Sequence, residues 1–198
     1  MLRSLPCAVA LAFALGAAAP ATGQSPSSAV DREHRAIFRE LVEVNTSPDG
    51  GRVSDASRAI ARRLLAAGFA PADVETPGRT AACLNLVATL RGRDRTARPV
   101  LLLAHLDVVN ARRADWRFDP FVLREADGWF VGRGTLDNKA GASALVANMI
   151  RWKREGFVPA RDVMLVLTCD EETDASNGMR WLLANRSTLS ITPSTFEA

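Results

Sequence analysis

The first part of the chain mixes apolar and charged residues with a helical period. Four apolar residues share one face of a first predicted helix that ends near Val44: Ile37, Phe38, Leu41 and Val42. Ser54 and Asp55 predict the cap of a second helix, which Gly68 closes. The predicted buried face of that helix consists of Ala56, Ile60, Leu64 and Leu65. Two amphipathic helices are therefore expected to open the fold.

Short apolar runs predict strands in the remainder of the chain. Strands are expected over residues 85–90, 100–104, 129–131 and 163–168. The runs at 100–104 and 163–168 lack polar alternation, which is typical of central strands covered on both faces. Helices are expected over 138–155, with Leu145, Met149 and Trp152 on one stripe, and over 175–185. This alternation predicts an α/β fold: a layered, mostly parallel central sheet with flanking helices.

Composition and charge narrow the class of protein. The 198 residues are 47% hydrophobic and 24% charged, which excludes a collagen-like or disordered chain and allows one sizeable core. The formal net charge of +3 is too small to indicate a nucleic-acid partner or an anionic membrane. The arginine-rich segment 91–98 lies between two predicted strands and ends at Pro99, so we interpret it as a solvated, hairpin-like loop.

Residues 1–23 have the pattern of a secretory signal peptide. Arg3 precedes an apolar stretch from Val9 to Ala19, and small residues follow as far as Gly23. The stretch is shorter than the roughly 20 residues of a membrane-spanning helix. We therefore expect an exported protein, periplasmic or secreted, without stable membrane association after signal cleavage. Residues 24–29 are rich in Ser and predict a flexible leader before the domain at 30–198.

Two cysteines remain after signal cleavage, Cys83 and Cys169. Both lie beside strand-like apolar runs. This placement is consistent with a disulfide in an oxidising compartment and equally with two thiols buried as small hydrophobic residues.

A first polar motif follows the apolar run 100–104. His105 and Asp107 are two residues apart, so in extended backbone they share a face. The Asp107 carboxylate can then accept a hydrogen bond from one ring nitrogen of His105 and leave the other nitrogen for a metal. A polar turn with an incidental histidine is the alternative.

A second motif, Gly132–Lys139, lies between a predicted strand and a predicted helix. Its glycines permit tight backbone geometry, and Asp137 falls where helix amides favour a carboxylate. Asp137 is therefore a candidate metal ligand or a simple helix N-cap. A phosphate cradle is a further alternative, although the segment lacks the Walker pattern and the third glycine of the dinucleotide fingerprint.

A third motif, Asp170-Glu171-Glu172, follows the predicted strand 163–168. Adjacent carboxylates repel one another, and a divalent cation offsets that repulsion. An exposed acidic loop is the alternative. Because all three motifs are expected at one edge of the same sheet, where open α/β sheets keep their sites, a metal centre is favoured.

The order His-x-Asp, Gly-Arg-Gly-x-x-Asp-x-Lys and Asp-Glu-Glu resembles a known family over roughly residues 34–185. That family is the zinc-dependent metallopeptidases that include glutamate carboxypeptidase, aminoacylase, acetylornithine deacetylase and succinyl-diaminopimelate desuccinylase. Trp116 with Asp119-Pro120-Phe121 also resembles the segment between the family's first two motifs. The resemblance implies a zinc-exopeptidase-like catalytic domain.

By this resemblance, His105 binds one zinc ion, Asp137 bridges two, and Glu172 binds the other. Glu171 is implied to act as general base, and Asp107 is implied to orient His105. A complete site would hold two Zn²⁺ ions, with Co²⁺ or Mn²⁺ as substitutes. The implied substrates are small peptides or N-acyl amino acids, cleaved at an amide bond. Full-length relatives are often homodimers through a lid domain.

The sequence departs from the family's pattern after residue 185. The segment 186–198 does not resemble the family's next strand, and the lid domain and final catalytic segment are not found. We therefore expect the N-terminal part of a family member, truncated and either active or inert. One alternative is a non-catalytic exported α/β module with at most weak binding of a single metal ion. A phosphate-binding protein using Gly132–Lys139 is the other.

Overall fold

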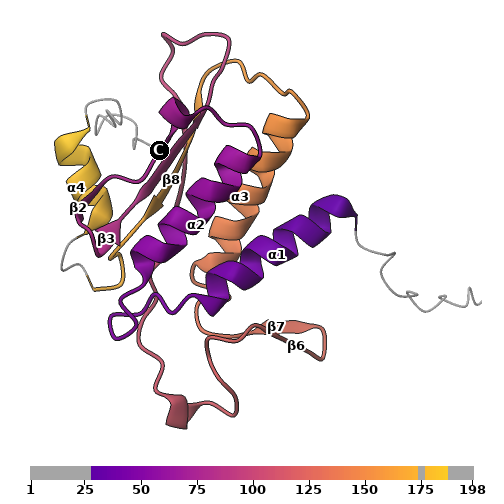
Figure 1. Cartoon of the computed structure of the whole chain (residues 1–198), viewed down its shortest axis with the longest axis vertical. Coiled ribbons are helices and arrows are strands. Elements are labelled where there is room, and N and C mark those ends of the chain that lie inside the picture. The colour runs from indigo at the N-terminus through magenta and orange to yellow at the C-terminus, as the bar shows by residue number, and fades with distance from the viewer. Residues whose placement is uncertain (1–27, 174–176, 187–198) are drawn as a thin grey trace, which may run out of the picture.

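The computed structural model describes residues 28–173 and 177–186 (Figure 1). The predicted signal peptide at 1–23 lies outside these residues, as do positions 24–27, 174–176 and 187–198. The described part contains four α-helices and one four-stranded sheet, together with two short β-ribbons. None of its helices has the length and apolar composition needed to cross a membrane.

Helix α1 (Ala29–Glu43) begins inside the predicted flexible leader. The Ser28 hydroxyl accepts a hydrogen bond from the Asp31 amide, and the Asp31 carboxylate accepts one from the Ser28 amide. This reciprocal capping box satisfies amides that have no partner within the helix. Ser28 and Ala29 are therefore the cap and the first residue of α1, and not part of the flexible leader predicted at 24–29. The predicted buried face of α1 is confirmed.

Helix α2 (Val53–Ala66) differs from its prediction at both ends. Arg52 occupies the cap position, and Ser54 lies within the first turn, where its hydroxyl accepts a hydrogen bond from the Leu84 amide at 3.1 Å. Leu65 is 41% exposed and not part of the buried face. Gly68 does end the helix, with a φ of 97° that side-chain-bearing residues rarely adopt. Ser54 therefore contacts a residue distant in the sequence and does not cap the helix. The local sequence pattern does not reveal this contact.

The central sheet is mixed, with the strand order β1-β4-β8-β5. Its strands are β1 (Val74–Glu75), β4 (Leu86–Leu90), β5 (Val100–His105) and β8 (Val163–Thr168). Strand β4 is antiparallel to both β1 and β8, whereas β5 and β8 are parallel. The layered α/β fold is confirmed, but "mostly parallel" is wrong, because a continuous apolar run records burial and not strand direction. Since β8 separates β4 from β5, segment 91–98 is no hairpin loop.

The two central strands expected from apolar runs differ in burial. Every residue of β8 is buried. Strand β5 pairs with β8 on one side and is the edge of the sheet among the described strands. Val100 and Leu103 of β5 are 46% and 50% exposed, so the prediction of full cover fails for this strand.

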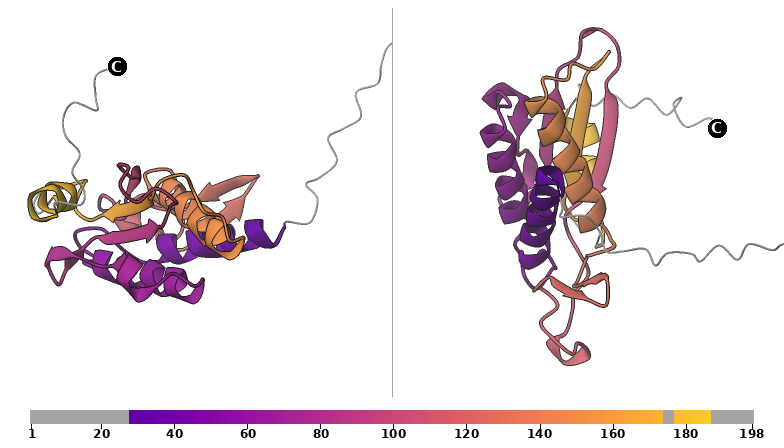
Figure 2. Two further views of the ribbon diagram at one scale, coloured as in Figure 1. Left: turned by 90° about the horizontal axis from the view of Figure 1, so that it is seen from above. Right: turned by 90° about the vertical axis from the view of Figure 1, so that its right-hand side faces the viewer.

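Helices cover the two faces of the sheet unequally (Figure 2). Helices α1, α2 and α3 (Lys139–Arg154) pack on one face through a core that includes Ile60, Val146 and Leu165. Helix α4 (Gly178–Asn185) packs on the other face through Leu182 against Val166. The remaining elements are η1 (Pro71–Asp73), β2 (Gly78–Thr80), β3 (Cys83–Leu84), η2 (Arg113–Asp115), β6 (Arg124–Ala126) and β7 (Trp129–Val131).

Candidate metal centre

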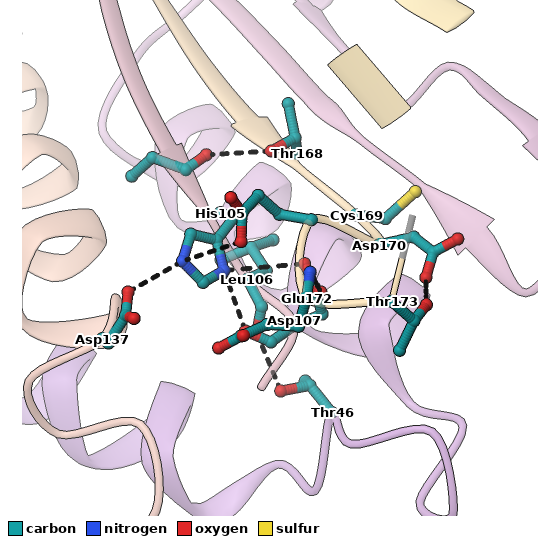
Figure 3. A network of polar contacts seen from close by, with 12 residues as sticks. Thr46, His105, Leu106, Asp107, Asp137, Thr168, Cys169, Asp170, Glu172 and Thr173 are labelled. Carbon is teal, nitrogen blue, oxygen red and sulfur yellow. Dashed lines mark hydrogen bonds and ion pairs between the residues drawn. The ribbon is translucent and has the colours of Figure 1, made fainter. Parts of the chain in front are cut away.

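The carboxyl ends of β5 and β8 bring two of the three motifs to one place. The strands are parallel neighbours in register, with His105 opposite Thr168. Residues that follow either strand therefore leave the sheet at the same edge, as Figure 3 shows for His105, Asp107 and Glu172. Asp137 arrives from the loop that precedes α3, the helix packed behind this edge.

One ligand atom from each of His105, Asp137 and Glu172 lies within 4.8 Å of the others. Nε2 of His105 donates to Oδ1 of Asp137 at 2.9 Å. His105 is buried, Asp137 is exposed and Glu172 is half-buried, so the cluster is open to solvent on one side. The structure therefore brings together the three residues that the motifs single out as metal ligands.

Asp107 contacts His105 mainly through its backbone. Nδ1 of His105 donates to the Asp107 carbonyl at 3.0 Å, while carboxylate Oδ1 lies 3.7 Å from Nδ1. The other carboxylate oxygen, Oδ2, accepts a hydrogen bond from the Glu172 amide at 2.9 Å. Oδ1 is buried and has no hydrogen-bond partner among the described residues. Asp107 thus contacts both His105 and the backbone of Glu172, and its Oδ1 can still accept a hydrogen bond.

The charges at the site shift the pKa values of two groups. Burial alone would lower the pKa of His105, but its contacts with Asp107 and Asp137 outweigh burial and raise the pKa to about 9. Burial raises the pKa of Glu172, and the nearby Asp137 carboxylate adds to the effect. Without a metal, the His105 imidazole is therefore a cation in contact with Asp107 and Asp137. The Glu172 carboxylate lies near other negative charges.

Glu171 lies beside the ligand cluster. Its Oε2 is 3.9 Å from Nε2 of His105, and its side chain is 60% exposed. The carboxylate is thus close to the ligand nitrogen of His105 and accessible from solvent.

Two structural roles near the site are not evident from the sequence. Lys139 is fully buried, and its Nζ donates to the Val44 carbonyl at 2.9 Å. Burial lowers the pKa of Lys139 to about 7, although the Asp107 charge opposes the shift. The Thr46 hydroxyl donates to the Leu106 carbonyl at 2.8 Å. Both contacts fasten the α1–α2 loop beneath the site, and no local pattern around residues 44–46 indicates them.

These contacts decide between the interpretations of Gly132–Lys139. The N-cap of α3 is Asn138, so Asp137 is not a simple helix cap. The Lys139 ammonium points inward to Val44, where it is unavailable to a phosphate. A phosphate cradle therefore has no support from this loop, whereas a metal ligand at Asp137 does.

Cys83 and Cys169 form a disulfide with a Cα–Cα distance of 5.6 Å, which resolves the alternatives left open by the sequence. His34 is half-buried in α1, and its Nε2 lies 3.1 Å from the Ser143 hydroxyl of α3. Burial lowers the pKa of His34. This second histidine is remote from the cluster and joins two helices.

The donor set fits a zinc ion. Imidazole and carboxylate oxygen are both ordinary zinc ligands, and a buried carboxylate oxygen without a partner lies next to the cluster. The half-open arrangement leaves room for a water molecule or a substrate atom, as catalytic zinc sites require.

The sequence of this chain is similar to the sequences of several curated proteins. The chain is 38% identical over 96 residues to the N-fatty-acyl-amino acid synthase/hydrolase PM20D1 of Bos taurus, covering 48% of this chain and 19% of that protein. It is 35% identical over 162 residues to the succinyl-diaminopimelate desuccinylase of Cereibacter sphaeroides, covering 79% of this chain and 40% of the relative. The chain therefore spans well under half of the length of these relatives.

A solved structure and a family model complete the comparison. Human carnosine dipeptidase 1 superimposes with a TM-score of 0.63 at 20% sequence identity, over 82% of this chain and 39% of that one. This likeness confirms the fold. The model of peptidase family M20/M25/M40 matches residues 101–195, a range that includes all three motifs. The resemblance to the metallopeptidases is therefore confirmed, and residues 101–195 match peptidase family M20/M25/M40.

Proposed function

We propose that this chain carries part of a zinc-dependent site that hydrolyses the amide bond of small peptides or N-acyl amino acids. The observation that carries the proposal is the convergence of His105, Asp137 and Glu172 within 4.8 Å at the sheet edge. The names of the relatives support the substrate class, since they include an N-fatty-acyl-amino acid synthase/hydrolase and a succinyl-diaminopimelate desuccinylase.

His105, Asp137 and Glu172 would hold the metal, with Asp137 exposed enough to bridge two ions. When bound, zinc supplies an acidified water and polarises the scissile carbonyl. His105 would bind through Nε2 once that nitrogen loses its proton, while Nδ1 donates to the Asp107 carbonyl and fixes the ring. Asp107 also holds the Glu172 backbone in place.

Glu171 would act as the general base. Its carboxylate lies beside His105 and is largely exposed, so it can accept a proton from an attacking water. The same carboxylic acid can return that proton to the leaving nitrogen. This assignment separates Glu171 from Glu172, although the two residues are adjacent in the sequence.

The experiment is hydrolysis of a panel of N-acyl amino acids and dipeptides with added zinc. Glu171→Gln is expected to lower kcat by roughly 10²–10⁴-fold while leaving zinc stoichiometry unchanged, because it removes the base and no ligand. Glu155→Gln removes a carboxylate at the end of α3, away from the site, and serves as the matched control. Turnover by Glu171→Gln at the wild-type rate would contradict the assignment.

A wild-type chain that binds zinc but turns over no substrate would favour the alternative of a non-catalytic, metal-binding α/β module.

Export is a second part of the proposal. Its supports are the signal-peptide pattern at 1–23 and the Cys83–Cys169 disulfide, since disulfides persist mainly in oxidising compartments.

A further inference from the structure

The Cys83–Cys169 disulfide lies directly beside the candidate metal centre. Cys169 immediately follows β8 and immediately precedes the acidic loop, Asp170–Thr173. Cys83 begins β3, which is 86 residues away in the sequence. The bond therefore fastens the backbone at the base of the loop that carries Glu171 and Glu172.

The Cys83 end of the disulfide is firmly anchored. Two serines of α2 hold Leu84: the Ser54 hydroxyl accepts from its amide at 3.1 Å, and the Ser57 hydroxyl donates to its carbonyl at 2.6 Å. Asn85 adds a bridge, because its side chain accepts from the Cys169 amide at 3.0 Å and donates to the Pro77 carbonyl at 3.1 Å. Helix α2 is thus connected through β3 to the start of the acidic loop.

The acidic loop brings negatively charged side chains close together. The Glu172 carboxylate interacts with the like charges of Asp137, Glu171 and Asp107, and like charges repel. The Glu172 amide is held by Asp107, and Asp170 has a left-handed backbone with a φ of 60°. A loop of this charge and conformation needs a fixed base to remain next to His105.

There is also space into which the loop can move. A cavity of about 210 Å³ lies next to Asp107, and both cysteines line it together with Asp170 and Thr173. The disulfide and the acidic loop therefore line the same cavity. Without the bond, the loop can shift into the cavity and withdraw Glu172 from His105.

We infer that the Cys83–Cys169 disulfide is a positioning element of the metal centre, which holds Glu171 and Glu172 at the place where metal binding and proton transfer need them. This inference rests on the proposed function. It assigns the bond a role in metal affinity in addition to any contribution to overall stability.

The test measures zinc affinity with a chromophoric competitor in wild type and in the double variant Cys83→Ser/Cys169→Ser. Loss of the support around a ligand is expected to weaken zinc binding by roughly 10–100-fold. Ile60→Val, in the core of α2 and outside the site, is the control for a general loss of stability. Its zinc affinity is expected to equal that of wild type. Equal affinities in wild type and the double variant would overturn the inference.

Two further readouts keep the outcomes distinct. If wild type itself binds no zinc, the proposed function fails, whereas unchanged binding in the double variant removes only the positioning role. If the double variant does not fold, hydrogen exchange in the oxidised and reduced wild-type chain decides. Faster exchange confined to the amides of 170–173 supports the inference. Unchanged exchange, or acceleration that extends over β4 and β8, contradicts it.

Discussion

Each ring nitrogen of His105 donates a hydrogen bond to an acceptor oxygen. Nδ1 donates to the Asp107 carbonyl and Nε2 donates to the Asp137 carboxylate. Two donating nitrogens describe an imidazolium, in agreement with the raised pKa of about 9. A metal ion on Nε2 must replace a proton, and the acidic residues that now stabilise the proton would then stabilise the metal.

Zinc affinity is consequently expected to depend on pH through His105. Below pH 9 the metal competes with a bound proton, so apparent affinity should rise with pH by up to about tenfold per unit and level off near pH 9. The raised pKa of Glu172 acts in the same direction at lower pH. Competitive zinc titrations between pH 6 and 9 measure this slope. An affinity independent of pH over that range would show that no ligand loses a proton on binding.

At the residue scale the sequence predicts the ligand candidates, but it leaves the Cys83–Cys169 pairing open and does not indicate the contact of Lys139 with Val44. His105, Asp137 and Glu172 belong to motifs that are recognisable within a few residues. The supports join distant positions: Lys139 reaches Val44, 95 residues away, and Cys83 reaches Cys169, 86 residues away. Such pairings follow from the packing of helices on the sheet, which a local pattern does not encode.

At the scale of elements, the sequence predicts the bounds of helices and buried strands more reliably than it predicts the order and direction of the strands. The bounds of α3 and β8 and the end of α1 fall within a residue of their predicted positions, because helical spacing and the apolar run of β8 define them locally. Strand order and direction depend on which strands meet in space. For this reason the mixed sheet and the edge position of β5 were not predictable from apolar runs.

The exposed side of β5 predicts self-association. Unpaired strand edges with apolar side chains are sites of aggregation, and a charged residue there suppresses it. Leu103→Lys should therefore reduce the concentration-dependent increase in mass measured by sedimentation velocity. Leu183→Lys is a matched control, because Leu183 is similarly exposed, at 47%, but lies on α4. If both lysine variants behave like wild type, the β5 edge does not drive association.

At the scale of the whole molecule, the chain spans 19% and 40% of the two curated relatives described above. The fold of that part brings the three residues of the candidate metal centre together from the end of β5, the loop after β8 and the loop before α3. Substrate choice and catalytic rate belong to the proposal and require the hydrolysis assay.

The proposed export also concerns the whole chain. Expression of residues 1–198 in a bacterial host should yield a periplasmic or secreted protein that begins at Gln24, because Gly23 ends the signal-peptide pattern. N-terminal sequencing checks the cleavage site, and a thiol assay should find Cys83 and Cys169 blocked. Recovery of the chain from the cytoplasm with Met1 retained would contradict export.

The most direct test of the metal centre is zinc binding by variants of the two histidines in this chain. His105→Ala removes the buried ligand, whereas His34→Ala removes a residue that contacts Ser143 and lies outside the cluster. In a competitive titration with circular dichroism to verify folding, His105→Ala should lose zinc binding by at least about 10²-fold. His34→Ala should retain wild-type affinity. Equal zinc binding by His105→Ala and wild type would show that the cluster is not the metal centre.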